Sequence, residues 1–166
     1  MFQVTEVARV AKAWAEIYND HPLVQSGVVF AHLSGLMVGG GAAVAADRGA
    51  LRARRADEAT RRSHLNHLRF VHRTVLVALS VVVASGVLLF ASDVETFLIS
   101  PIYWTKTALV VLLAVNGWFL MRTGNRLDQG ELAPEPGWHR LAITSVVSLS
   151  LWFLVILAGT VLVSFG

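Results

Sequence analysis

Apolar residues gather into four long stretches along this chain, and the short segments between them hold most of the charges. The stretches cover about residues 23–46, 70–91, 102–121 and 141–165. Each has about the 20 residues that an α-helix needs to cross a bilayer. The pattern therefore predicts an all-α integral membrane protein in which residues 21–166 form one four-span domain. Short connections favour an up-and-down four-helix bundle, with the first and third spans diagonally opposite.

A shorter, two-sided pattern precedes the first span and predicts an amphipathic helix over residues 1–20. Its apolar side holds Val7, Val10, Trp14 and Ile17, and its polar side holds Glu6, Arg9, Lys12 and Glu16. Such a helix is typical of a membrane surface, where aromatic residues also gather. Pro22 then stands in the first turn of the next helix.

The segments between the spans differ in kind. Residues 47–69 are rich in arginine and contain no proline, so we expect a helix that extends the flanking spans. Residues 92–95 read as a short acidic turn. Residues 122–140 contain Pro134, Pro136 and several glycines, and we expect a loop there.

The charge distribution predicts the orientation in the membrane. Charged residues make up 15% of the chain, against about a quarter in soluble domains. The net charge of +3 comes from arginines after the first and third spans. The positive-inside rule then places both termini on the periplasmic side of a bacterial inner membrane. The expected partner of this basic excess is membrane lipid and not nucleic acid. The absence of cysteine excludes disulfides, iron–sulfur clusters and covalent c-type haem.

His32 is the first candidate for chemistry, because it lies well inside the first span. An ionisable group at membrane depth indicates a functional site. Gly35 and Gly39 follow on roughly the same helix face and offer space without side chains. One interpretation is a haem held by His32 as its metal ligand. The other is a GxxxG packing seam in which the histidine bonds a neighbouring helix.

Lys106 is the second candidate, near the start of the third span. It lies five residues beyond Pro101, roughly 7 Å of helical rise, and His32 lies roughly 9 Å beyond Ser26. The two groups should therefore share one depth, and they meet across the core if both face inward. Lys106 would then be a second haem ligand or a partner for a propionate. In the other interpretation its side chain extends to the headgroups.

Further histidines lie at the opposite membrane face. His72 and His139 have comparable depth on diagonal spans, so one interpretation is a second haem between them, with Arg73 on its propionates. The other is that both are interfacial. We expect His64, in the arginine-rich segment, to be solvated.

Several short motifs resemble the HemJ-type protoporphyrinogen oxidases and related small four-helix haem-binding membrane proteins. They are F-A-H-L-S-G-L around His32, V-H-R-T around His72, Y-W-T-K-T-A-L-V-V-L-L around Lys106, and the pair His139-Arg140. The resemblance covers about residues 23–165. It implies haem b, with His32 and Lys106 in the roles of the family's first-span histidine and third-span lysine.

These observations lead to two hypotheses of function. The first is a haem b-binding membrane redox protein (an oxidoreductase if it is an enzyme) that acts on a porphyrinogen or passes electrons to a quinone. The second is a non-catalytic accessory subunit of a larger respiratory or photosynthetic complex, or of a homo-oligomer. A soft-metal or proton-coupled permease has little support, because intramembrane Met, Cys and carboxylate ligands are not apparent.

Overall fold

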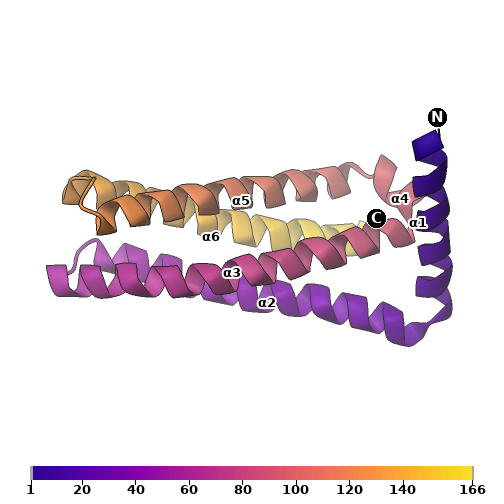
Figure 1. The fold of residues 1–166 in the computed structure, drawn as a ribbon, viewed down its shortest axis with the longest axis horizontal. Helices are drawn as coiled ribbons and strands as arrows, with labels where there is room; N and C mark the ends of the chain where they lie inside the picture. The colour runs from indigo at the N-terminus through magenta and orange to yellow at the C-terminus, as the bar shows by residue number, and fades with distance from the viewer. Residues whose placement is uncertain (1, 166) are drawn as a thin grey trace.

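The fold is an all-α bundle with one helix across its end. The computed structural model describes the backbone of residues 2–165 and the side chains of residues 11–162 and 164. Residues 2–165 form six helices: α1 (Phe2–Asp20), α2 (Pro22–Ala53), α3 (Glu58–Ser92), α4 (Val94–Ile99), α5 (Pro101–Asp128) and α6 (Pro134–Phe165). Figure 1 shows α2, α3, α5 and α6 side by side, with α1 across one end. These four helices are long and apolar enough to cross a membrane, as the sequence pattern predicts.

The bundle consists of two closely packed hairpins. One hairpin is α2 with α3, and the other is α5 with α6. Contacts between α2 and α6 join the hairpins, whereas α3 and α5 touch only sparsely. The predicted diagonal placement of the first and third spans is therefore confirmed. The sparse side between α3 and α5 leaves the interior least covered there.

Local sequence signals explain where the helices begin. Pro22 opens α2, and Pro101 opens α5, where the Ser100 hydroxyl accepts a bond from the Tyr103 amide at 3.3 Å. Asp57 caps α3 by accepting a hydrogen bond from the Thr60 amide at 2.9 Å. The side chain of Thr60 and then its amide lower the pKa of the Asp57 carboxyl, because both stabilise the charged form.

Two predicted connections are shorter in the structure than expected. The expected loop at residues 122–140 is mostly helical, because α5 continues to Asp128 and α6 begins at Pro134. Proline is tolerated in a first helical turn, where the amides have no intrahelical partner, so Pro134 and Pro136 start the helix and do not interrupt it. The acidic turn expected at residues 92–95 is shorter, because α3 ends at Ser92, α4 begins at Val94, and Asp93 between them caps α4 by accepting a bond from the Thr96 amide. A helix of six residues is too short to show periodicity.

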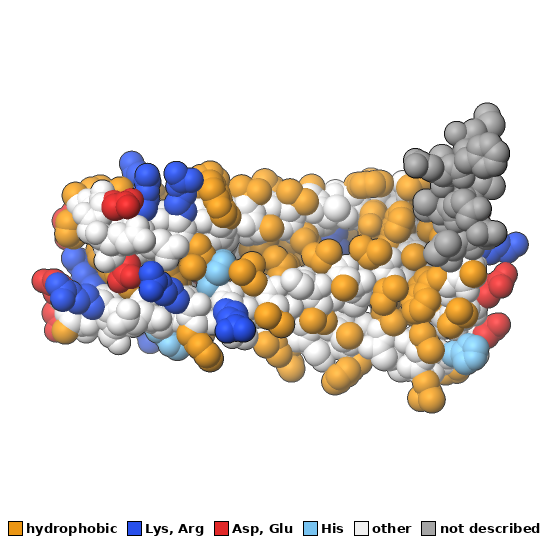
Figure 2. Space-filling model, in the orientation of Figure 1, with side chains coloured by type: hydrophobic (Ala, Val, Ile, Leu, Met, Phe, Trp, Pro, Cys, Tyr) orange, Lys and Arg blue, Asp and Glu red, His pale blue; other side chains and the backbone are white. Residues whose placement is uncertain are grey.

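The middle of the bundle has an apolar surface, and the charges lie at its ends. On α2 the side chains of Phe30 and Met37 are 72% and 73% exposed. Figure 2 shows apolar side chains over the middle of the molecule and charged ones gathered at the end that holds residues 54–57 and 129–133, here the arginine-rich end. So broad an apolar belt marks a surface in contact with lipid.

Helix α1 is fixed to the other end of the bundle. The Trp14 indole donates a hydrogen bond to the Leu88 carbonyl of α3 at 2.8 Å. Tyr18 is buried beside it. The crosswise position fits the predicted surface helix, although the side chains of residues 1–10, which carry half of the two-sided pattern, lie outside the described residues.

Candidate functional site

His32 is buried in the interior and held by one side chain from the neighbouring helix. It is 7% exposed, and its Nδ1 lies 2.9 Å from the Ser85 hydroxyl on α3. That hydroxyl lies 2.6 Å from the Val81 carbonyl, to which it donates its proton. We therefore assign the Nδ1–H tautomer, in which Nδ1 donates to Ser85 and Nε2 keeps its lone pair.

The Nε2 atom of His32 is buried with no hydrogen-bond partner among the described residues. A buried acceptor without a partner is uncommon and calls for an explanation. Metal-ligating histidines show the same arrangement, in which one ring nitrogen is fixed by a hydrogen bond and the other binds the metal. The atom thus fits an axial ligand for haem iron.

Lys106 turns toward the interior and not toward the end of the bundle. Its Nζ lies 3.5 Å from where a Cβ on Gly159 of α6 would stand, and the His32 ring lies at the same distance from a Cβ on Gly86 of α3. Glycine at both positions therefore gives the two side chains room. Lys106 and His32 are close enough to interact electrostatically, although they come from diagonal helices.

The space expected beside Gly35 and Gly39 is filled. A Cβ on Gly35 would stand 2.8 Å from Val82 Cγ2 and 3.1 Å from the Ala78 carbonyl oxygen, both on α3. A Cβ on Gly39 would stand 3.0 Å from Ala78 Cβ and 3.4 Å from the Trp152 ring. This face is a close-packed seam between helices. The Nε2 atom of His32 thus fits a ligand for haem iron, but the face of α2 that holds Gly35 and Gly39 has no space for the haem.

A cavity of about 270 Å³ lies in the interior toward the arginine-rich end. Residues from all four spanning helices line it, including Asp47, His72, Gly117, Ser148 and Trp152. Its wall includes α3 and α5, which have the least contact of any two neighbouring spanning helices. The cavity is mostly apolar, with a carboxyl, an imidazole and a hydroxyl among its lining groups.

The remaining residues predicted for a site lie neither beside His32 nor, apart from His72, in the interior cavity. His139 and Arg73 are exposed, and neither lines the cavity that contains His72. The structure therefore does not bring His72 and His139 together for a second haem. His64 is not solvated as expected, since its ring packs on Gly49 and lies 6.2 Å from the Trp138 ring, and its Nε2 is buried without a partner among the described residues.

Asp47 is the residue that sequence reasoning missed. It is 3% exposed, and its Oδ2 has no hydrogen-bond partner within the described part of the chain. Ser145 and Ser148 of α6 lie beside it. The signal was present, because Asp47 continues the four-residue series Gly35, Gly39, Ala43 on one face of α2. Its position at the start of an arginine-rich segment gave no indication that its side chain is buried.

Comparison of the chain with protein-family models, curated proteins and solved structures finds no match. The resemblance to HemJ-type oxidases thus stands on the short motifs alone.

Proposed function

We propose that this protein binds haem b within the membrane, with His32 Nε2 as an axial ligand, and that it transfers electrons. The single observation that carries the proposal is the buried, unpartnered Nε2, aimed by the bond from Nδ1 to Ser85. Haem iron would supply a one-electron ferric–ferrous couple. Lys106 supplies a positive charge near His32, and its role is to compensate a propionate.

Space for the macrocycle would come from the sparse side of the bundle. The seam between α2 and α3 is too closely packed to admit it, as the contacts of Gly35 show. Among neighbouring spanning helices, α3 and α5 contact each other least, so moving these two apart breaks the fewest interactions. We therefore expect haem to stiffen that side, with slower amide hydrogen exchange in α3 and α5.

The visible spectrum of the purified protein tests the proposal. The wild type should show a Soret band and a b-type pyridine haemochrome, and His32→Ala should lose both. His139→Ala is the matched control, because that histidine is exposed and does not line the interior cavity. A folded wild type that stays colourless after incubation with haemin would contradict the proposal, as would a His32→Ala variant with full haem content.

The interior cavity favours a quinone as the redox partner over a porphyrinogen. A volume of about 270 Å³ suits the ring of a quinone, whereas a porphyrinogen is a tetrapyrrole as large as haem. The imidazole of His72 can donate a hydrogen bond to a quinone oxygen, and the carboxyl of Asp47 can donate one when it is protonated. An isoprenoid tail would leave between α3 and α5 into the bilayer.

A substitution that fills the interior cavity tests whether a quinone binds there. Gly117 lines it, and a Cβ there would meet nothing within 4 Å, so Gly117→Leu should fold and block the space. Gly41→Leu is the control, because Gly41 is equally open but lies outside the cavity. Quenching of tryptophan fluorescence by a short-chain benzoquinone should weaken about tenfold in Gly117→Leu only. Equal quenching in both variants would contradict a quinone at this place.

We further propose that the arginine-rich end faces the cytoplasm of a bacterium, with both termini periplasmic. The arginines near residues 54–57 and 122–126 support this through the positive-inside rule. Because the chain has no cysteine, single variants Gln129→Cys and Asn19→Cys report orientation directly. An impermeant maleimide added to intact spheroplasts should label only Asn19→Cys. Labelling of Gln129→Cys instead would contradict the proposed orientation and indicate the opposite one.

A further inference from the structure

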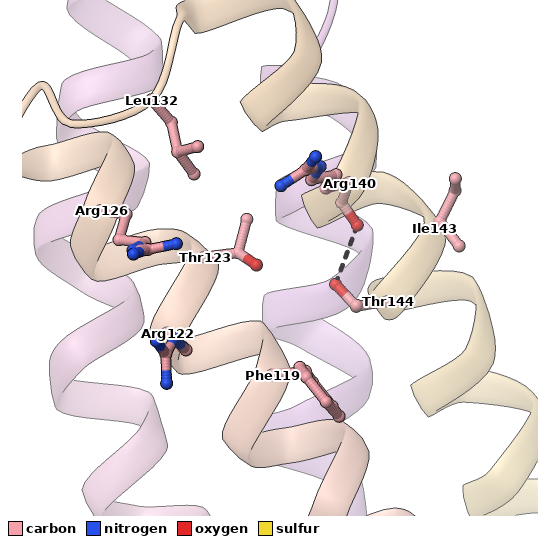
Figure 3. A pocket seen from close by; sticks show the side chains of 8 residues that line it. All are labelled: Phe119, Arg122, Thr123, Arg126, Leu132, Arg140, Ile143 and Thr144. Carbon is pink, nitrogen blue, oxygen red and sulfur yellow. Dashed lines mark hydrogen bonds between the residues drawn. The ribbon is translucent and has the colours of Figure 1, made fainter.

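A second cavity, of about 320 Å³, lies between α5 and α6 at the arginine-rich end. Three arginines line it: Arg122 and Arg126 from α5, and Arg140 from α6. Figure 3 shows Arg126 and Arg140 extending toward one another from the two helices. Like charges that share a space repel each other, and an anion between them removes this cost.

The protein itself does little to neutralise these arginines. Arg126 pairs with Glu131 at 3.4 Å, but both side chains are about half exposed, so the pair is weak. Arg122 stacks over the Trp118 ring at 5.2 Å, which leaves its charge in place. Within the described side chains, no salt bridge involves Arg122 or Arg140.

The same cavity has an apolar lower wall. Phe119 of α5 and Ile143 of α6 line it on the side of the membrane interior. Below them the outward residues Val115 and Val147 are 47% and 41% exposed, so an apolar surface continues along both helices. A free phosphate ion would gain nothing from this surface, whereas the acyl chains of a lipid would lie along it.

We propose that this cavity binds the phosphate of an anionic phospholipid, with its acyl chains against α5 and α6. Guanidinium groups bind phosphate oxygens through paired hydrogen bonds, and basic pockets between membrane helices bind anionic headgroups. The site is separate from His32 and from the interior cavity, so it does not depend on the proposed haem.

Native mass spectrometry of the full chain in neutral detergent tests the site. The probes are phosphatidylglycerol, phosphatidylcholine with the same acyl chains, and inorganic phosphate. We expect one phosphatidylglycerol to be retained in preference to phosphatidylcholine, and phosphate not to displace it. The triple variant Arg122→Gln, Arg126→Gln, Arg140→Gln should bind about 100-fold more weakly, at about tenfold or less per arginine.

The control variant carries the same loss of charge at the same end of the molecule. It is Arg48→Gln, Arg52→Gln, Arg55→Gln, in which the replaced side chains are exposed and lie outside the cavity. It should bind phosphatidylglycerol as the wild type does. Equal losses in the two triple variants would show diffuse charge attraction and overturn the proposal. Equal retention of the two lipids, or displacement by inorganic phosphate, would also overturn it. Circular dichroism establishes that each variant is folded.

Discussion

Replacing Gly35 by alanine should destabilise the bundle, although alanine is the better helix former. The added Cβ would stand 2.8 Å from Val82 Cγ2 and 3.1 Å from the Ala78 carbonyl oxygen. Valine in a helix has one strongly preferred rotamer, and the carbonyl belongs to the backbone, so neither can move aside alone. Helices α2 and α3 must therefore separate slightly along their seam.

Gly41→Ala isolates the size of this effect. Gly41 lies in the same helix, and a Cβ there meets nothing within 4 Å. Both variants gain the same helix propensity, about 1 kcal/mol, so the difference between them is the steric cost alone. Overpacking of this kind costs about 1–3 kcal/mol. We expect Gly41→Ala to be more stable than the wild type and Gly35→Ala to be about 1–3 kcal/mol less stable than Gly41→Ala.

Reversible unfolding by SDS in mixed micelles, followed by circular dichroism, measures this difference. The two alanine variants are compared directly, with the wild type as reference. Equal free energies of unfolding for Gly35→Ala and Gly41→Ala would refute the close seam, and with it the statement that no cofactor fits on that face of α2.

Three further predictions concern single side chains. Ser85→Ala removes the partner of His32 Nδ1 and should weaken haem binding by about 10–100-fold, as measured by haem transfer to apomyoglobin. Ser80→Ala is the control and should leave haem binding unchanged, because the Ser80 hydroxyl bonds only the Leu76 carbonyl. Asp57 has a lowered native pKa, so its contribution to stability is complete above about pH 4 and is lost as the pH falls through that lowered value. Thermal unfolding between pH 7 and 3 should thus depend less on pH in Asp57→Asn, and an unchanged profile would contradict the cap. Asn116→Ala removes the 2.9 Å bond to the Thr144 carbonyl and should lower the free energy of unfolding in SDS titration by about 0.6 kcal/mol, with about 1.7 as an upper bound. No loss would mean that the bond between α5 and α6 contributes nothing.

The spans could be predicted from the sequence because membrane depth demands long apolar helices, and those leave a clear pattern. The residues at which the helices end were harder to predict. The continuation of α5 to Asp128 follows no hydropathy rule, because residues 122–128 are polar and helical at once. Arginine-rich helix and arginine-rich loop look alike by composition.

The interior was only partly predictable. His32 was found because an imidazole in an apolar run is conspicuous. His64 was assigned to solvent and Asp47 was not recognised as a site residue, because arginines surround both in sequence, but α2 and α3 direct them inward. The glycines near His32 had two interpretations, and only the position of α3 shows that Val82 and Ala78 fill their face. Whether a glycine leaves space or lets another helix approach depends on tertiary structure.

Imidazole rescue tests most directly whether His32 binds iron. His32→Gly removes the ring and leaves a hole of its size beside Ser85 and Gly86. Haem titration of this variant should give no low-spin Soret band alone and should regain one when free imidazole is added at millimolar concentration. His139→Gly should bind haem with or without imidazole. A His32→Gly spectrum that equals the wild-type spectrum without imidazole, or that stays unchanged with it, would show that this histidine only links two helices.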